Sequence, residues 1–331
     1  MNYYTILGGG GVVANQLAKL LLSKNRVVRM VSRSGYRIDG TISVKADATI
    51  LNQLIAAVKD SSVVYLCVGL KYDHSVWALQ WPSILSNTIE ACKRTGSRLV
   101  FLDNVYSYGK VDGIMTELTP YNPCSKKGEI RAKLATKFME EVKGGSVVGL
   151  IARSADFYGP YADKTGIPNI MVFRPFSQGK KASWLVNDQT KHSFTFTLDI
   201  ADALYTLSES HQAYGQIWHL PTAPNPLTGK EFIELAAREL GVPARYRVLH
   251  KWTLRLAGLF DKTVSELYEM LYQNEVNYIF DSSKFQKTFQ VTPTSYKSGI
   301  IRTAQYYKVL KLFKKGDITK ASLLDHRFFP G

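Results

Sequence analysis

The sequence predicts an α/β fold built on a doubly wound parallel sheet, with a smaller C-terminal α/β part. Short apolar runs of strand length alternate with helical stretches through the first 152 residues. The runs are apolar on both faces, as expected of strands that helices cover on each side. Four consecutive glycines, Gly8–Gly11, follow the first run directly. These three observations together indicate a parallel sheet sandwiched between helices.

In the N-terminal half, the spacing of hydrophobic residues predicts where each strand and helix lies. We expect strands at residues 3–7, 27–31, 63–68, 99–102 and 147–152. A period of 3.6 predicts helices at residues 12–22, 51–58, 77–94 and 129–142. The third of these helices contains Pro82, which we expect to interrupt or kink it.

Beyond Arg153, segments rich in Pro, Gly and polar residues separate shorter elements. Here we expect strands at residues 193–197 and 216–220, and helices at residues 200–208, 230–240 and 252–272. Gly241 and Pro243 are typical helix stop signals. We therefore divide the chain into a sheet domain at residues 1–152, a mixed segment at residues 153–308 that completes the sheet and caps it, and a basic tail at residues 309–331.

Composition fits one large folded unit or two intimate ones. The chain has 331 residues, of which 45% are hydrophobic and 21% charged, which excludes extended disorder. No run approaches 18 apolar residues, so we expect no membrane insertion. Three widely spaced cysteines and a start without a basic leader favour a reducing cytoplasm. The net charge of +15 favours anionic partners, and its densest stretch, residues 308–320, is expected to be a solvated helix and tail.

The glycine run is placed where a nucleotide diphosphate could bind. It joins the first strand to a helix that begins with Val12 and Val13. Glycines allow the backbone to turn tightly and to approach a diphosphate, and the helix start offers free N–H groups with a positive dipole end. We expect Gly8, Gly10 and Gly11 to form this loop, so that residues 1–152 would be a dinucleotide-binding domain of Rossmann type.

The end of the second strand favours NADP over NAD. An acidic residue there would bind the ribose 2′-hydroxyl of NAD, but the sequence reads Ser32-Arg33-Ser34, with no carboxylate before Asp39. Arg33 can offer a fork of donors to a 2′-phosphate, and Ser32 can add a hydroxyl. Asp47, after the next strand, could bind the adenine amino group or cap a helix.

Several segments, taken in order, resemble the extended and atypical short-chain dehydrogenase/reductases, the epimerase and dehydratase relatives. Gly8, Gly11 and Ala14 match a G-x-x-G-x-x-G/A loop, and Val68-Gly69 stands where the fourth strand ends beside the cofactor. Three further stretches resemble motifs of that family: FLDNVYSYG at residues 101–109, LIARSADFYGP at residues 150–160 and SFTFTLDIADA at residues 193–203. The resemblance implies a Rossmann-type fold, a nicotinamide cofactor and hydride transfer.

The usual Tyr-x-x-x-Lys pair of that family is missing. Lys127 stands at the tyrosine position, Arg131 at the lysine position, and Asn104 at the preceding Ser or Thr. We expect Lys127 and Arg131 to share one helix face beside the cofactor, where Arg131 would bind ribose or phosphate and lower the pKa of Lys127. Lys127 would then donate a proton, and Asn104 would hold a substrate carbonyl. Alternative proton donors are three tyrosines in loops near the strand ends: Tyr106, Tyr108 and Tyr158.

The resemblance also implies where a carbonyl-bearing or sugar-like substrate would lie. Asp156 and Phe157 resemble positions that face substrate, although Asp156 could equally cap the following loop. Tyr158, and Tyr72 after the cofactor-side strand, are further candidate substrate residues. His192 comes just before the V-x-D-like stretch, where nucleotide-sugar enzymes usually carry an arginine that grips the diphosphate. Four residues of the last long helical pattern could wall the pocket or pack: Glu266, Tyr268, Glu269 and Tyr272.

Two other functions remain open on the same fold, a non-catalytic NADP-binding sensor and an RNA-binding protein. The positive charge motivates the latter, but no aromatic-plus-basic motif supports it, so nucleic acid is not the expected partner. No metal site is expected, because the histidines show no H-x-x-x-H or H-x-E pairing and no Cys-x-x-Cys occurs. A homodimer through the helices at residues 77–94 and 129–142 is plausible.

Overall fold

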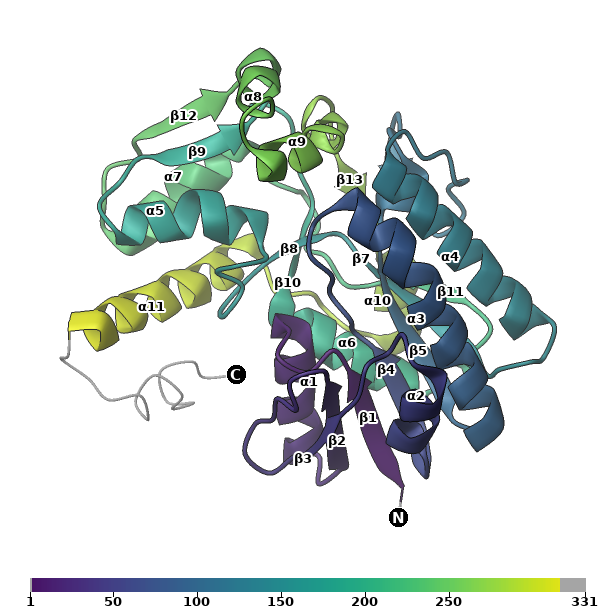
Figure 1. Cartoon of the computed structure of the whole chain (residues 1–331). Helices are drawn as coiled ribbons and strands as arrows, with labels where there is room; N and C mark the ends of the chain where they lie inside the picture. Colours follow the sequence, from purple (N-terminus) through teal and green to yellow (C-terminus); the bar gives the residue numbers. More distant parts are fainter. Residues whose placement is uncertain (1, 316–331) are drawn as a thin grey trace.

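A parallel sheet forms the centre of the computed structural model, which describes residues 2–315 (Figure 1). Its seven strands lie in the order β11-β7-β5-β4-β1-β2-β3, and every neighbouring pair is parallel. The strands are β1 (Tyr3–Leu7), β2 (Val27–Ser32), β3 (Ile42–Lys45), β4 (Ser61–Leu66), β5 (Arg98–Asn104), β7 (Gly149–Ser154) and β11 (Ile217–His219). The strand order reverses between β1 and β4, which is where doubly wound sheets bind ligands.

Helices cover both faces of the sheet, as the doubly apolar strands require. One face packs against α1 (Val12–Ser23), α6 (Thr197–Glu209) and α10 (Ser283–Phe289). The other packs against α2 (Leu51–Val58), α3 (His74–Thr95) and α4 (Lys126–Lys143). Most residues of β4 and β5 are buried between these two layers. The α/β class predicted from the sequence is confirmed.

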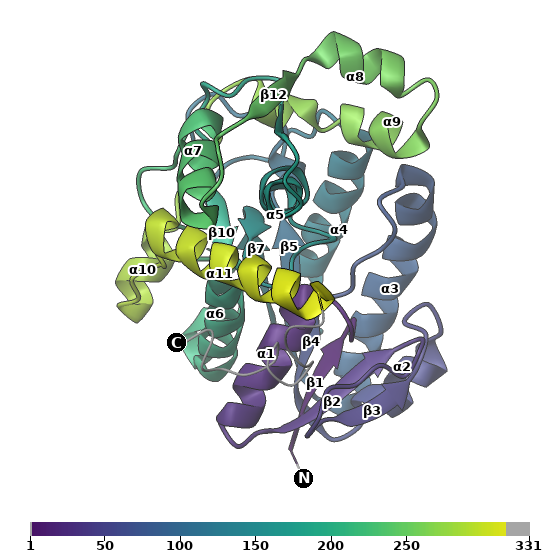
Figure 2. The same ribbon diagram turned by 90° about the vertical axis from the view of Figure 1, so that its left-hand side faces the viewer.

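A smaller mixed part lies beyond the carboxyl ends of the strands (Figures 1 and 2). Its strands pair in parallel twos: β8 (Asp156–Tyr158) with β10 (Phe194–Phe196), β9 (Ala182–Leu185) with β12 (Tyr246–Leu249), and β6 (Ile114–Met115) with β13 (Ile279–Phe280). Its helices are α5 (Arg174–Ser177), α7 (Gly229–Leu240), α8 (Lys251–Ala257), α9 (Lys262–Tyr268) and α11 (Tyr296–Lys315). An aromatic core centred on Tyr158 and Phe232 holds several of these elements together.

The prediction of a single long helix at residues 252–272 is wrong. The chain forms α8 and α9 instead, followed by a 3₁₀ turn at Leu271–Asn274. The break has a local cause: the Asp261 carboxylate accepts hydrogen bonds from the N–H groups of Thr263 and Val264, which starts a new helix. By contrast, α3 runs through Pro82 without interruption, and Pro82 is exposed, so water can bond the carbonyl that it frees.

The described residues end within the basic C-terminal stretch. α11 continues to Lys315, across the start of the tail expected at residue 309. Asp317 and Lys320 lie outside the described residues. Within residues 2–315, no helix combines the length and the apolar character that crossing a bilayer would need.

Candidate functional site

The glycine loop turns sharply between β1 and α1 and packs against the end of β4. Gly8 has a φ of +105°, and a Cβ at Gly8 would lie 2.6 Å from the carbonyl oxygen of Cys67. The N–H groups of Gly8 and Gly9 both donate to the Val31 carbonyl at 3.0 Å, which ties the loop to β2. Only glycine fits at residue 8, because a side chain there would be both strained and in collision with backbone.

The start of α1 is left without a cap of its own. Gly11 is the N-cap and carries no side chain, and the first turn of the helix contains no acidic residue. Its first-turn amides, including those of Val12 and Val13, therefore point out of the helix with a positive dipole end and no carboxylate to neutralise it. This arrangement fits a bound diphosphate, because the free amides and the positive dipole end both favour an anion at the start of α1.

The residues expected at the adenosine end lie at the carboxyl ends of β2 and β3. Arg33 is exposed just past β2. The Ser32 hydroxyl accepts a hydrogen bond from the Tyr36 N–H at 2.8 Å, which leaves its proton free to donate. Asp47 accepts from the N–H and the hydroxyl of Thr49, and these bonds, with the Arg33 charge nearby, lower its pKa. Asp47 is thus held in a turn before α2 rather than capping that helix.

Three residues expected near the nicotinamide lie at the carboxyl ends of β4 and β5. Gly69 follows β4 and is exposed, with open space where a Cβ would be, and Val68 packs beside it against the core. The Asn104 side-chain oxygen, at the end of β5, accepts a hydrogen bond from the Tyr106 N–H at 3.1 Å. The Asn104 amide NH₂ is consequently the part of this side chain that could hold a substrate oxygen.

Lys127 is buried at the start of α4, but its partners differ from those expected. Its ammonium donates to Glu269 Oε1 at 2.7 Å, to a Glu266 carboxylate oxygen and to the Glu266 carbonyl at 3.0 Å. It also lies 4.6 Å from the centre of the Tyr72 ring. Two carboxylates from α9 and the residue after it therefore neutralise Lys127, and sequence reasoning gave them no such role.

The sequence suggested that Arg131 lies beside Lys127 and lowers its pKa, but Arg131 has other partners in the structure. Its guanidinium bonds Asp103 Oδ1 and lies over the rings of Trp81 and Phe101. Arg153 bonds the other oxygen, Oδ2, of the same carboxylate. Burial opposes ionisation of Asp103, but the two arginines outweigh it and hold the pKa of its carboxyl below the usual value. Arg131 therefore belongs to a buried charge triad inside the fold.

Two of the tyrosines proposed as proton donors are also engaged elsewhere. Tyr108 donates from its hydroxyl to His219 Nε2 at 2.7 Å, because His219 Nδ1 donates to the Asp281 carbonyl. Burial raises the pKa of Tyr108 to about 12 and lowers that of His219 to about 3. Tyr158 lies almost completely buried inside the aromatic core.

The remaining substrate-side residues are brought together. Asp156 and His192 lie on adjacent short segments, with Oδ2 and Nε2 3.0 Å apart. The His192 ring stacks between Phe194 and Tyr278, with ring centres 4.4 and 4.2 Å away. Phe157, by contrast, packs partly buried against the core on the α1 face. Tyr278 has no motif or spacing that could have marked it, because its part in the site comes only from tertiary packing.

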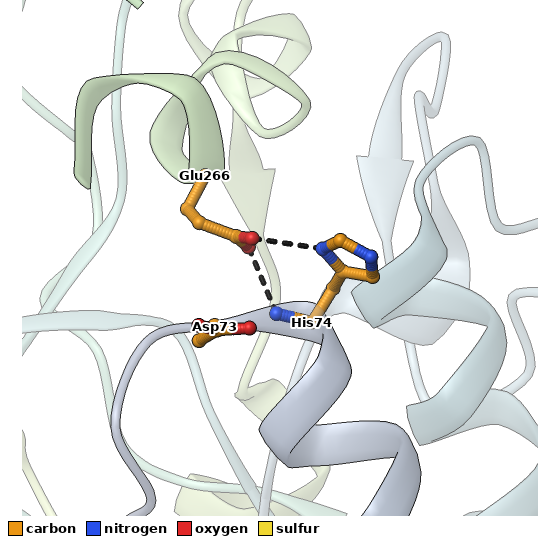
Figure 3. Close-up of side chains that lie close together, drawn as sticks. All are labelled: Asp73, His74 and Glu266. Carbon is orange, nitrogen blue, oxygen red and sulfur yellow. Dashed lines mark hydrogen bonds and ion pairs between the residues drawn. The ribbon is translucent and has the colours of Figure 1, made fainter. Parts of the chain in front are cut away.

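A further group of polar side chains joins α9 to the start of α3 (Figure 3). His74 Nδ1 lies 2.8 Å from Glu266 Oε1, and the His74 N–H donates to Glu266 Oε2 at 2.9 Å. Asp73, His74 and Glu266 offer potential ligand atoms within 4.8 Å of one another. However, Lys262 bonds Asp73 at 2.6 Å and Lys127 bonds Glu266, so lysines already neutralise both carboxylates. We interpret the group as an ion-pair network that holds α9 against α3 and α4.

Comparison with known proteins decides the family. The model of the NAD dependent epimerase/dehydratase family matches residues 4–220, a range that takes in the glycine loop and the strands of the central sheet. The chain belongs to this family. Membership confirms the resemblance seen in the sequence and makes the chain an enzyme of the NAD-dependent oxidoreductase or epimerase type, which binds a nicotinamide dinucleotide. A search of curated proteins finds no match to the chain.

Solved structures of epimerases and dehydratases share the family fold. UDP-glucose 4-epimerase of Thermus thermophilus, in complex with NAD, superposes with a TM-score of 0.74 at 15% identity, over 92% of this chain and 99% of that one. The Thermotoga maritima enzyme with UDP-glucose gives 0.76 at 14% identity, over 93% and 99%. The dTDP-glucose 4,6-dehydratase of Streptomyces venezuelae, with NAD bound, gives 0.75 at 17% identity, over 92% and 96%. These likenesses confirm the Rossmann-type architecture.

Proposed function

We propose that this family member uses NADP to move hydride to or from a carbonyl-bearing, sugar-like small molecule. The uncapped start of α1 behind the glycine loop is the observation that carries the proposal. The N–H groups of its first turn have no acceptor within the helix, and a diphosphate could accept their hydrogen bonds. The preference for NADP over NAD rests on Arg33. It is the exposed cation just past β2, where no carboxylate stands to bind a ribose hydroxyl.

The chain's own residues would orient the carbonyl and manage its proton. When bound, the nicotinamide supplies the hydride that adds to the carbonyl carbon. The Asn104 NH₂ donates a hydrogen bond to the carbonyl oxygen and stabilises the charge that develops there. Lys127 Nζ gives up one of its three hydrogen bonds to Glu266 and Glu269 and passes that proton to this oxygen, so that the carbonyl becomes a hydroxyl and the lysine becomes a neutral amine. Glu266 and Glu269 hold the ammonium in place before the substrate arrives.

Cofactor choice can be tested by titrating the purified protein with NADPH and with NADH and following nicotinamide fluorescence. We expect tighter binding of NADPH, and we expect Arg33→Ala to weaken NADPH about tenfold or more while leaving NADH nearly unchanged. Arg37→Ala is the matched control, since Arg37 is exposed in the same loop. Equal weakening of both cofactors by Arg33→Ala would contradict the assignment of the 2′-phosphate.

The reaction type can be tested by following NADPH consumption across a panel of aldehydes, ketones and keto-sugars. For any substrate found, Lys127→Met should lower kcat about a hundredfold or more, since the proton donor is lost. Lys137→Met should have no effect, because Lys137 lies exposed on the same helix and its ammonium donates to the Ser86 hydroxyl. Full activity of Lys127→Met would remove Lys127 from the mechanism.

We also propose that the protein pairs through α3 and α4, which pack side by side. Leu79, 76% exposed on α3, is an apolar residue that such a contact would cover. Sedimentation velocity should then show a dimer that Leu79→Glu converts to a monomer, whereas a monomeric wild-type protein would contradict the pairing.

A further inference from the structure

Side chains from the segments that follow three neighbouring strands of the sheet lie close together. β7, β5 and β4 lie next to one another, and their carboxyl ends lead to Asp156, Tyr106 and Tyr72 respectively. The hydroxyl of Tyr72 donates to that of Tyr106 at 3.4 Å. Parallel strands end at one edge of the sheet, so these groups face the side where open α/β sheets bind ligands.

The segment after α9 covers this edge with two more tyrosines. Tyr272 lies in the 3₁₀ turn, and Tyr278 precedes β13 and stacks on His192. Both hydroxyls are buried without a hydrogen bond of ordinary geometry, although the Ser125 side chain and the Asp156 backbone are polar neighbours. A buried hydroxyl without a partner costs free energy that a hydroxylated ligand would restore.

Asp156 is the accessible charge of this cluster. Its carboxylate is 23% exposed, whereas His192, its partner, is almost completely buried and held between two rings. Burial first, and the Asp156 carboxylate in addition, raise the pKa of Tyr72, Tyr106 and Tyr278. These phenols therefore remain neutral hydrogen-bond donors around one negative charge.

The cations of the surrounding network are already paired. Lys127 bonds two carboxylates, and Arg131 and Arg153 share Asp103. Lys191 is exposed beside His192, but its charge acts on Glu231 at the start of α7. A ligand that carries two phosphate charges would meet Asp156 with only the exposed Lys191 to compensate, because the buried cations Lys127, Arg131 and Arg153 are already paired.

We propose that Asp156, His192 and the four tyrosines, here called the Asp156 subsite, select a hydroxylated carbonyl compound that is neutral or cationic where it is recognised, and reject nucleoside diphosphates. The tyrosine hydroxyls donate to ligand oxygens, and the Asp156 carboxylate accepts from ligand hydroxyl or ammonium groups. The subsite thus differs in ligand charge from the solved relatives whose structures contain UDP-glucose. The inference rests on the proposed function, because it places the substrate at this edge of the sheet.

The test compares four probes on the NADPH-loaded protein by saturation-transfer NMR and calorimetry: D-glucose, D-glucosamine, UDP-glucose and dTDP-glucose. D-Glucosamine is a cation near neutral pH, and we expect it to bind more tightly than D-glucose. We expect neither nucleotide sugar to bind at millimolar concentration. Binding of UDP-glucose to the wild-type protein, or binding of neither free sugar, would overturn the proposal.

A charge-swapped variant makes the test specific. Asp156→Asn with His192→Arg should weaken D-glucosamine about tenfold or more and should create measurable binding of UDP-glucose. The single variant Asp156→Asn serves if the double variant does not fold, and it should weaken D-glucosamine to the level of D-glucose. Lys191→Gln, which changes an exposed neighbour, should change the binding of neither D-glucosamine nor UDP-glucose. An unchanged ligand preference in the charge-swapped variant would overturn the role of Asp156.

NADPH titration separates this inference from the proposed function. Each protein is first titrated with NADPH alone, and unchanged affinity in the variants shows that the fold and the cofactor site are intact. If the wild-type protein does not bind NADPH, the proposed function is contradicted. Normal NADPH binding together with UDP-glucose binding contradicts only the ligand class assigned to the Asp156 subsite.

Discussion

The buried carboxylate of Asp103 is the residue whose loss should destabilise this protein most clearly. Its Oδ1 accepts from Arg131, and its Oδ2 accepts from Arg153 Nε at 3.1 Å and Nη2 at 2.8 Å. Asp103→Asn keeps the shape but replaces one oxygen by an NH₂ group that faces a guanidinium. Two of the four charged hydrogen bonds are lost, and two buried arginine charges remain without their counter-ion. We expect the free energy of unfolding to fall by about 3–5 kcal/mol.

Urea unfolding, followed by tryptophan fluorescence, measures this loss, and its pH dependence identifies the cause. The folded-state pKa of Asp103 is lowered from 3.8, so its ionisation stabilises the fold above that value. The difference between wild type and Asp103→Asn should therefore be fully present at pH 7. It should shrink as the pH falls below about 4 and through the folded-state pKa.

Glu90→Gln is the matched control, because it is the same change from acid to amide in an exposed pair. Glu90 bonds Arg94 at 2.6 Å on the surface of α3, where the side chains are 36% and 53% exposed. Its loss should cost about 0.3–0.5 kcal/mol. A loss for Asp103→Asn as small as that for Glu90→Gln, or one that does not change with pH, would refute this account of the triad.

Three further predictions concern the glycine loop, a helix cap and the α9 contact. Gly8→Ala should reduce NADPH affinity at least tenfold, because the added Cβ would lie 2.6 Å from the Cys67 carbonyl oxygen. Gly113→Ala is the control and should leave NADPH affinity unchanged, because Gly113 has the same φ of +105° but open space where a Cβ would be. Equal effects of the two substitutions would show that the contact with Cys67 is not the cause. Thr228→Ala should lower the free energy of unfolding by about 1 kcal/mol, because Thr228 forms a capping box at α7; no change in urea unfolding would count against it. Lys127→Met should speed hydrogen exchange in α9, since both carboxylates there lose their buried cation, and unchanged exchange would show that the contact does not hold the helix.

The central sheet could be predicted closely because its signals are local. β1 begins and ends at the residues expected, as does α2, since continuous apolar runs and a helical period appear within short windows. The break between α8 and α9 was missed because the apolar pattern continues across it, whereas a single capping side chain, Asp261, decides it. The long periodic pattern predicted one continuous helix, and it contains no signal for the cap that Asp261 forms.

Some neighbours within the candidate site could be predicted from the sequence, but most of its contacts could not. Asp156 and His192 could be singled out from the motifs, and the structure brings them together. The partners of Lys127 are Glu266 and Glu269, which stand 139 and 142 positions away along the chain, so no sequence window contains them. The carboxylate of Asp103, which binds Arg131, likewise takes its second arginine from another strand. Charge pairing of this kind depends on which strands become neighbours, and that follows only from the fold.

The most direct test of the central claim is a crystal structure of the protein with NADP. We expect the diphosphate to lie against the backbone of Gly8–Gly11 and the first turn of α1, with the 2′-phosphate within hydrogen-bond distance of Arg33. We expect the nicotinamide ring to lie on the side of Asn104 and Lys127. A diphosphate bound away from the start of α1, or a 2′-phosphate with Arg33 turned away from it, would contradict that claim.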